Sequence, residues 1–315
     1  MNSLVVGTGS IGVRHARNLK FLGFNVFVFS HSNNSKIENE FHLISKSEVD
    51  NKFFDVIVIA SITSLHISDA IWLLNKTNKM YIEKPLSNDK ENIDLFTSKL
   101  FNSNCDVNFG FMLRSHPNIV AIKKFIDSNQ LGSIYYSHAN VGQYLGDWRP
   151  KTDYKKSYSS FIHKGGGVVL DLIHEIDLIH YMFKDFESYI SDVSNVSTLN
   201  IETEGLAFIL FKHLNGIRSS VRLDYVRPVY ERKFEIVGEN GILQWDYLKG
   251  DVFFINRKNE SFLIDCVPND FTRNDMFLIH LESFIKRKYD LNTLKNEVND
   301  VVKIFAIACD IRNLQ

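Results

Sequence analysis

The chain has 315 residues, and at roughly 150 residues per domain this length predicts two domains. Hydrophobic residues make up 44% and charged residues 23%, which excludes wholesale disorder because enough apolar surface exists to offset chain entropy. The 36 Lys and Arg residues almost balance the 37 Asp and Glu residues, for a net charge of −1. This balance gives no electrostatic reason to expect nucleic acid or an anionic membrane as a partner.

The three cysteines, Cys105, Cys266 and Cys309, lie far apart in the sequence. An odd, scattered set matches neither a disulfide framework nor a zinc signature, so we expect reduced thiols and no metal. No segment approaches the roughly 18 apolar residues of a membrane span, and no signal peptide precedes Gly7. We therefore expect a cytoplasmic protein.

The first part of the chain alternates short apolar runs with helical patterns. We expect strands at residues 4–6, 26–29, 54–60, 80–82 and 106–111, and helices at residues 11–22, 65–75 and 88–101. Strands that alternate with helices in this way predict a doubly wound parallel sheet.

A glycine-rich turn joins the first strand to the first helix, and it reads Gly7, Thr8, Gly9, Ser10, Ile11 and Gly12. In a dinucleotide-binding turn, the first glycine permits a tight bend and the second lets the backbone approach a pyrophosphate. The third lets the helix pack closely on the strand. The free N–H groups of the helix would then bind the anion. The alternative is an ordinary glycine-rich turn.

The second strand ends at Ser30, His31 and Ser32, and the next acid is Glu38. An NAD-binding strand usually ends in a carboxylate that binds the ribose hydroxyls. Hydroxyl groups and an imidazole favour a 2′-phosphate instead, so we expect NADP somewhat more than NAD. A solvated loop is the alternative.

The tripeptide Glu83-Lys84-Pro85 follows the strand at residues 80–82. Open α/β sheets bind their ligands at the carboxyl ends of the strands. A partly buried lysine there can donate or accept a proton. Pro85 would pin the turn, with a cis bond as one option. A merely structural or solvated lysine is the alternative.

The second part of the chain has a different pattern, with many runs that alternate apolar and polar residues. We expect strands at residues 134–143, 188–197, 206–213, 216–226, 231–238 and 241–247, and helices at residues 119–129, 276–288 and 294–309. Short turns such as Asn215-Gly216 indicate hairpins and a mostly antiparallel sheet. Its exposed aromatic residues predict that the open face binds another subunit.

The segment at residues 165–177 combines three glycines with Asp171, His174 and Glu175. Offsets of three and four residues share one face of a helix, so these three side chains should point together. An imidazole beside a carboxylate is suited to proton transfer. The glycines would let a ligand approach the start of the helix. Surface charges around a satisfied histidine are the alternative.

These motifs resemble those of the Gfo/Idh/MocA oxidoreductase family, in the same order and over nearly the whole chain. The resemblance rests on residues 7–12, 83–85, 108–114 and 165–177. It implies an N-terminal Rossmann domain at residues 1–115. It also implies a C-terminal α+β domain at residues 116–315, with a large, mostly antiparallel open sheet that binds substrate and forms homodimers or homotetramers.

The resemblance also implies the roles of the candidate residues. Lys84 matches the lysine that contacts cofactor and substrate, and Asp171 and His174 match the catalytic pair. The usual spacing is Asp-x-x-x-His, whereas this chain has Asp-x-x-His followed by Glu175. His174 is therefore the expected general acid/base, and either Asp171 or Glu175 would orient it.

Two further sets of residues complete the expected site. The implied cofactor contacts are Gly7, Gly9, Ser10, Ile11, Gly12, Ser30, His31, Ser61, Thr63, His66, Glu83 and Lys84. The implied substrate contacts are Lys84, Arg114, Arg149, Tyr154, Tyr158, Asp171, His174 and Glu175. The region around Arg149 also resembles, more loosely, family members found with bacterial surface-glycan pathways. A solvated loop is the alternative there.

We therefore expect an NAD(P)-dependent enzyme that transfers a hydride between nicotinamide and a hydroxyl carbon of a sugar, sugar acid, cyclitol or nucleotide sugar. Surface-glycan biosynthesis is its expected setting. Two alternatives stay open, namely an NAD-dependent glycoside hydrolase of the same fold and a non-enzymatic dinucleotide or sugar sensor. The sequence leaves the individual substrate undecided.

Overall fold

A computed structural model describes residues 1–32, 40–148, 150 and 152–313. The chain forms two compact units. The first unit comprises Met1–Phe111, His163–Gly165 and Thr272–Ala306, and the second comprises Met112–Ile162, Gly166–Phe271 and Ile307–Gln315. The N-terminal segment of the first unit ends near the expected boundary at residue 115. Residues 272–306 also belong to this unit, although the sequence interpretation assigned them to the second domain.

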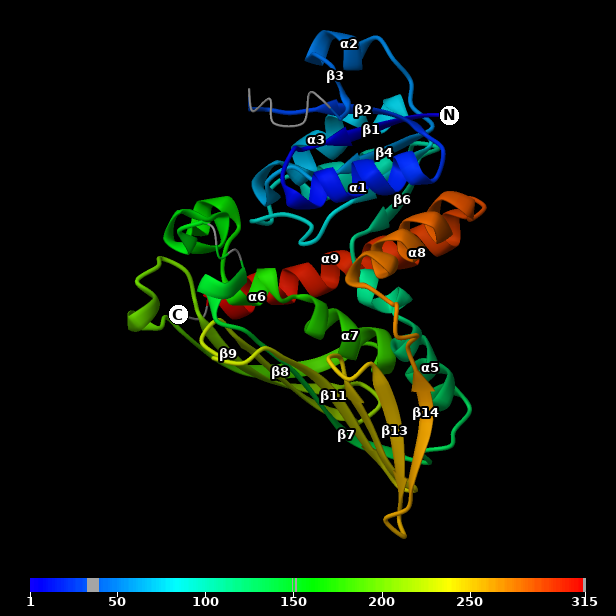
Figure 1. Ribbon diagram of the computed structural model, residues 1–315, viewed down its shortest axis with the longest axis vertical. Coiled ribbons are helices and arrows are strands. Elements are labelled where there is room, and N and C mark those ends of the chain that lie inside the picture. Colours follow the sequence, from blue (N-terminus) through cyan, green and yellow to red (C-terminus); the bar gives the residue numbers. More distant parts are fainter. Residues whose placement is uncertain (33–39, 149, 151, 314–315) are drawn as a thin grey trace. The chain divides into compact units, whose positions relative to one another are not determined.

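The first unit contains a six-stranded parallel sheet in the order β3-β2-β1-β4-β5-β6 (Figure 1). Its strands are β1 (Asn2–Val6), β2 (Asn25–Phe29), β3 (His42–Leu43), β4 (Val56–Ile59), β5 (Lys79–Ile82) and β6 (Asp106–Phe109). The predicted doubly wound parallel sheet is confirmed. The short edge strand β3 was not predicted, because two residues are too few to show a periodic pattern.

Helices and short 3-10 turns connect these strands. The connecting helices are α1 (Ser10–Phe21), α2 (Lys46–Asp50), α3 (His66–Leu73) and α4 (Ile93–Phe101), with 3-10 turns η1 (Thr63–Leu65) and η2 (Leu74–Lys76). Two further helices, α8 (Arg273–Lys286) and α9 (Leu291–Asn313), follow the last strand of the chain, and α9 passes from the first unit into the second. Helix α4 begins later than predicted, after Asn92 with a left-handed φ of 59°. Helix α8 begins earlier, where the Thr272 N–H donates a hydrogen bond to Asp275.

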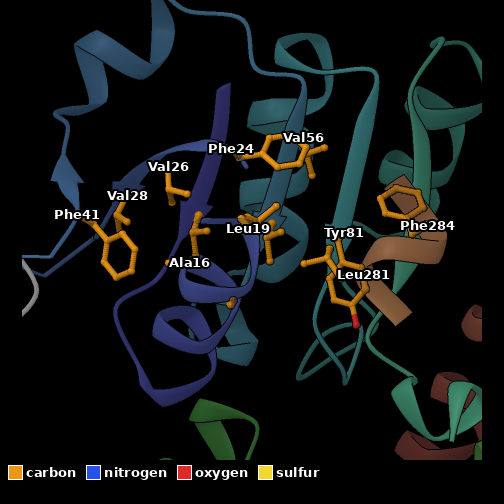
Figure 2. Close-up of a cluster of buried hydrophobic side chains, with 13 residues drawn as sticks. Ala16, Leu19, Phe24, Val26, Val28, Phe41, Val56, Tyr81, Leu281 and Phe284 are labelled. Atoms are coloured by element: carbon orange, nitrogen blue, oxygen red, sulfur yellow. The ribbon is translucent and has the colours of Figure 1, made fainter. Parts of the chain in front are cut away.

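The core of the first unit lies between the sheet and helices that come from both ends of its sequence. Leu19 of α1 packs in the same cluster as Tyr81 of β5 and as Leu281 and Phe284 of α8 (Figure 2). A parallel sheet is buried on both faces, so it needs helices as cover. The return of residues 272–306 supplies part of that cover.

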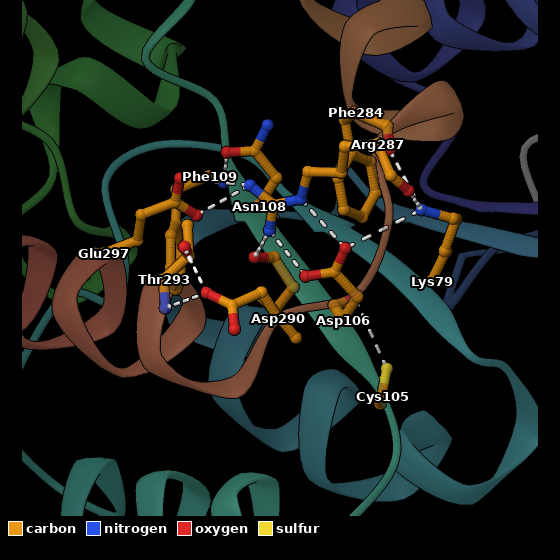
Figure 3. Close-up of polar contacts among 11 residues, drawn as sticks. Lys79, Cys105, Asp106, Asn108, Phe109, Phe284, Arg287, Asp290, Thr293 and Glu297 are labelled. Atoms are coloured by element: carbon orange, nitrogen blue, oxygen red, sulfur yellow. Dashed lines mark hydrogen bonds and ion pairs between the residues drawn. The ribbon is translucent and has the colours of Figure 1, made fainter.

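An ion-pair network fastens the returning segment to the sheet (Figure 3). Arg287 donates to both oxygens of Asp106, at 2.8 and 2.5 Å, and it also donates to Glu297 at 2.8 Å. Lys79 donates to the backbone oxygens of Phe284, at 3.1 Å, and Arg287, at 2.8 Å. The Asp106 carboxylate is buried, so this network compensates a charge that would otherwise be costly.

The second unit contains an eight-stranded sheet in the order β14-β13-β12-β11-β7-β10-β9-β8. Its strands are β7 (Ile134–Gly142), β8 (Phe186–Ser194), β9 (Leu206–His213), β10 (Arg218–Asp224), β11 (Glu231–Gly238), β12 (Gly241–Asp246), β13 (Asp251–Asn256) and β14 (Ser261–Cys266). Strands β7 and β10 pair in parallel and the other neighbours are antiparallel, which confirms the predicted mostly antiparallel sheet. Strands β13 and β14 were not predicted.

Helices pack on one face of this sheet. They are α5 (Pro117–Asp127), α6 (Val168–Asp171) and α7 (His174–Phe183). The second unit also contains the 3-10 turns η3 (Met112–Ser115), η4 (Leu145–Trp148), η5 (Tyr154–Lys156), η6 (Tyr158–Ser160) and η8 (Ser197–Leu199), and η7 (Ile162–Lys164) begins at its last residue before the chain returns to the first unit. Helix α7 contacts β7 and β10 (Figure 1). Across the residues that the structure describes, no helix is long and apolar enough to cross a membrane.

The network at Arg287 predicts a large effect on stability. Arg287→Met should lower the free energy of unfolding by about 3 kcal/mol, because it removes the main partner of a buried carboxylate. Urea denaturation followed by circular dichroism measures this change. The control is Arg17→Met, which breaks the exposed pair with Glu40 and should leave the midpoint unchanged. Equal losses in the two variants would contradict the proposed importance of the network.

Candidate functional site

The glycine turn after β1 is shaped by two very close backbone approaches. Gly7 has a φ of +114°, and a Cβ at this position would lie 2.3 Å from the carbonyl oxygen of Ala60. A Cβ on Gly12 would lie 2.1 Å from the carbonyl oxygen of Gly7. Neither position therefore tolerates a side chain, and the two glycines allow α1 to pack against the strand ends.

The middle glycine differs from these two. Gly9 has an ordinary φ of −70°, and nothing lies within 4 Å of a Cβ built there. It precedes α1, whose first turn has neither a side-chain cap nor an acidic residue. Ser10 is exposed and Ile11 is half-buried. An open approach to uncapped N–H groups fits a pyrophosphate, so these residues are suited to hold a dinucleotide.

The end of β2 is tied to the end of β4 through a buried acid that the sequence analysis missed. Asp69 of α3 lies with one carboxylate oxygen 2.8 Å from His31 Nε2, and its other oxygen accepts a hydrogen bond of 2.7 Å from Ser61. The Ser30 hydroxyl lies 3.3 Å from that of Thr8. No local motif marks Asp69, because only the fold brings α3 beside these two strand ends.

Three of the predicted cofactor contacts, Ser61, Thr63 and His66, follow β4, and the structure buries the last two of them. Thr63 is buried, and His66 has its Nδ1 atom 2.8 Å from the Pro85 carbonyl oxygen and its Nε2 atom 3.1 Å from that of Ser61. Burial lowers the pKa of His66 despite these two hydrogen-bond acceptors. His66 therefore organises the loop from inside.

The Glu83-Lys84-Pro85 turn follows β5, at the same sheet edge as the glycine turn, because the strands are parallel. Glu83 is buried, and its Oε1 atom lies 2.7 Å from His15 Nε2. Its other oxygen accepts a 3.2 Å hydrogen bond from the Lys84 backbone N–H. Lys84 is half-buried, and the Lys84–Pro85 peptide is cis.

In the second unit, the glycine-rich segment packs on the protein itself. A Cβ on Gly166 would lie 2.3 Å from the Tyr158 carbonyl oxygen, and one on Gly167 would lie 2.2 Å from the Glu204 carboxylate. These two glycines are therefore required by packing, and the expected approach of a ligand to the start of the helix stays a prediction. Arg312 contributes to the same region, where it donates to the Gly166 carbonyl oxygen at 2.8 Å.

The acids that follow these glycines diverge to different partners. The segment forms two short helices, α6 and α7, instead of the one continuous helix that the sequence predicted. Asp171 accepts a 2.6 Å hydrogen bond from Tyr225, whereas Glu175 accepts one of 2.8 Å from Arg232. The expected single helix is thus divided into two, and Asp171 and Glu175 bind different partners, while the convergence of these side chains on His174 stays a prediction. All three side chains are buried.

The pairing of buried charges explains why the acids diverge. Burial alone would lower the pKa of the Arg232 guanidinium, but Glu175 raises it above its usual value. Burial and the neighbouring Asp171 raise the pKa of the Tyr225 hydroxyl, which therefore stays a hydrogen-bond donor. Tyr225 directly follows β10 and Arg232 lies in β11, and the sequence contains no motif that would have identified them.

Other predicted substrate contacts are also engaged within the second unit. Arg114 donates to both oxygens of Asp177, at 3.0 and 2.5 Å, which fastens η3 to α7. The Tyr154 hydroxyl donates to the Leu199 carbonyl oxygen at 3.1 Å, and Tyr158 is half-buried. The predicted contact Arg149 lies outside the described residues.

Comparisons with known proteins show what this chain is similar to. The family model of the GFO/IDH/MocA C-terminal domain matches residues 119–244. A curated relative, inositol 2-dehydrogenase/D-chiro-inositol 3-dehydrogenase of Lacticaseibacillus casei, is 25% identical over 76% of this chain and 70% of its own. Residues 119–244 of this chain are therefore similar to the C-terminal domain of the GFO/IDH/MocA family.

Solved structures of other proteins have the same fold as this chain. Levoglucosan dehydrogenase in complex with NADH superposes with a TM-score of 0.83, at 16% identity over 99% of this chain and 95% of that one. UDP-N-acetylglucosamine 3-dehydrogenase from Acidithiobacillus ferrooxidans has a TM-score of 0.77, at 17% identity over 99% and 96% of the two chains.

The open space at Gly9 predicts a variant that loses cofactor without losing stability. Gly9→Ala should fold normally, because its Cβ meets nothing and its φ is ordinary, yet it should weaken NADPH or NADH binding by about tenfold or more. Fluorescence titration measures the affinity, and urea denaturation measures the stability. The control Gly12→Ala should lose stability itself, because its Cβ clashes with backbone. Normal cofactor affinity in Gly9→Ala would contradict a pyrophosphate site at this turn.

Proposed function

We propose that this protein transfers a hydride between NAD(P) and a hydroxyl carbon of a sugar, sugar acid, cyclitol or nucleotide sugar. The observation that carries the proposal is the pairing of two features at one sheet edge. The first is the open glycine turn at Gly9, and the second is the anchored turn that presents Lys84. The names of the compared dehydrogenases support this range of substrates, which includes an inositol, an anhydrosugar and a nucleotide sugar.

A bound nicotinamide supplies the hydride acceptor or donor, and the protein supplies position and proton transfer. In this proposal, Lys84 donates a hydrogen bond to the reacting hydroxyl and stabilises negative charge that develops on its oxygen. His174 accepts the hydroxyl proton in oxidation and returns it in reduction. Asp171 is the better candidate to orient His174, because its partner Tyr225 is uncharged, whereas the Glu175 carboxylate forms an ion pair with Arg232.

His174→Ala tests the assignment of the general acid/base. Turnover should fall by about 10²- to 10⁴-fold, because water must then accept the proton in place of His174. The affinity for NADPH should stay close to that of the wild type. Absorbance at about 340 nm, where the reduced nicotinamide absorbs, follows the reaction. The assay uses myo-inositol, levoglucosan and UDP-N-acetylglucosamine as trial substrates. The control is His42→Ala, an exposed histidine on β3, which should leave turnover unchanged.

Two results would contradict this proposal. Near-normal turnover of His174→Ala would remove His174 from the mechanism. Cleavage of a glycoside with tightly retained cofactor and no net reduction would instead indicate the hydrolase alternative. We also propose that the enzyme acts in surface-glycan biosynthesis, on the basis of the segment that contains Tyr154 and Tyr158. Turnover of a nucleotide sugar in preference to myo-inositol would support this role.

We also propose that NADP is the preferred cofactor. Ser30, His31 and Ser32 offer hydroxyl and imidazole groups where an NAD-specific strand would end in a carboxylate. Asp69 does not replace that carboxylate, because it is buried and both of its oxygens are engaged by His31 and Ser61.

His31→Ala tests this preference. NADPH should bind about tenfold more weakly, because a hydrogen bond to the charged 2′-phosphate is lost, whereas NADH affinity should change little. Fluorescence titrations of both cofactors measure the two dissociation constants, with His42→Ala as the matched control. Tighter binding of NADH than NADPH by the wild type would refute the preference.

We further propose that the chain forms a homodimer or homotetramer through the open face of its eight-stranded sheet. Ile190 and Leu210 are direct neighbours across β8 and β9, and both are exposed, as is Phe208. Adjacent apolar side chains on the face opposite α7 favour a protein partner.

Leu210→Lys combined with Phe208→Lys should convert the oligomer to monomer, because each buried charge lacks a partner in the interface. Sedimentation equilibrium measures the mass. Leu214→Lys is the control, since this exposed side chain lies in the β9–β10 hairpin and should leave the mass unchanged. A monomeric wild type would contradict the proposed assembly.

A further inference from the structure

We propose that His15 is a positioning residue, which acts through Glu83 to hold Lys84 in place, with His66 fixing the other side of the same turn. This inference rests on the proposed function, in which Lys84 contacts the cofactor and the substrate. His15 belongs to none of the motifs that identified the site. It is assigned here on its contacts alone.

His15 is fully buried in α1, the helix that begins at the glycine turn. The rings of Tyr81 and Phe277 lie 5.1 and 5.7 Å from the imidazole, so aromatic contacts hold its orientation. Its Nε2 atom is 2.7 Å from Glu83 Oε1. The ring is therefore fixed so that Nε2 is directed at the carboxylate.

Glu83 transmits this contact to the backbone of the next residue. Its Oε2 atom accepts the Lys84 N–H, and a Cβ at Gly110 would lie only 2.6 Å from the same oxygen. The carboxylate therefore has little room to move on that side. Burial alone would raise the pKa of Glu83, but the hydrogen bond and charge of His15 and the charge of Lys84 hold it below its usual value. Glu83 thus stays an ionised acceptor.

His66 restrains the residue that follows Lys84. Its Nδ1 atom lies 2.8 Å from the Pro85 carbonyl oxygen, and the ring is buried. Lys84 is therefore flanked by two anchored residues, one held through a side chain and the other through a backbone carbonyl. Because α1 begins at the glycine turn and contains His15, one helix joins the proposed phosphate site to the turn that holds Lys84.

The alternative is that His15 only stabilises the fold and does not determine the position of the Lys84 side chain. Acetylation of lysines by acetic anhydride, read by peptide mass spectrometry, separates the two cases without requiring a substrate. Saturating NADPH should slow the acetylation of Lys84 in the wild type, and the exposed Lys20 on α1 serves as the internal control. A parallel experiment with NADH covers the other cofactor.

We define the protection of Lys84 as the ratio of its acetylation rates without and with saturating NADPH. In His15→Leu this ratio should fall by about fivefold or more, because the charge-assisted hydrogen bond to Glu83 is lost. The affinity for NADPH should change much less, since the glycine turn is intact. His15→Gln, whose amide can still donate to Glu83, should restore most of the protection. Glu83→Gln, which keeps the size of the side chain, should reproduce the loss and serves if His15→Leu does not fold.

The outcomes distinguish this inference from the function on which it rests. If bound cofactor does not protect Lys84 in the wild type, the proposed role of Lys84 fails. If the wild type is protected and the folded His15→Leu and Glu83→Gln variants are protected equally well, the positioning role of His15 is overturned while the proposed function stands.

Discussion

At the end of β1 the backbone passes so close to that of β4 that no side chain fits between them. A Cβ on Gly7 would meet Ala60, and one on Gly12 would meet Gly7. This steric constraint lets α1 begin immediately after β1 and leaves its first N–H groups uncapped. It also directs the same helix, through His15, toward Glu83. The phosphate site and the lysine turn therefore depend on one close approach of backbone.

The first unit is completed by a part of the chain that is remote in sequence. Its parallel strands need cover on both faces, and α8 contributes Leu281 and Phe284 to the core. The Arg287 network then compensates the buried Asp106 carboxylate. Sequence reasoning placed these helices in the second domain, because helical periodicity shows that a helix has an apolar face but not which sheet that face covers.

The acidic cluster in the second unit shows a similar limit of spacing arguments. The offsets between Asp171, His174 and Glu175 suggested one shared helical face. The chain turns between α6 and α7, and Tyr225 and Arg232 each take a different acid. A buried carboxylate is stabilised by the nearest donor, and those donors lie more than 50 residues away in the sequence.

The sequence by itself determined the features that depend on neighbours along the chain. The alternation of strands and helices, the glycine turn and the Glu83-Lys84-Pro85 tripeptide are local patterns, and the parallel sheet follows from them. Tertiary structure alone decided which distant side chains meet, such as Asp69 with His31, Tyr225 with Asp171, and His15 with Glu83. These pairs form because burial requires each polar group to find a partner, and the fold determines which partner is within reach.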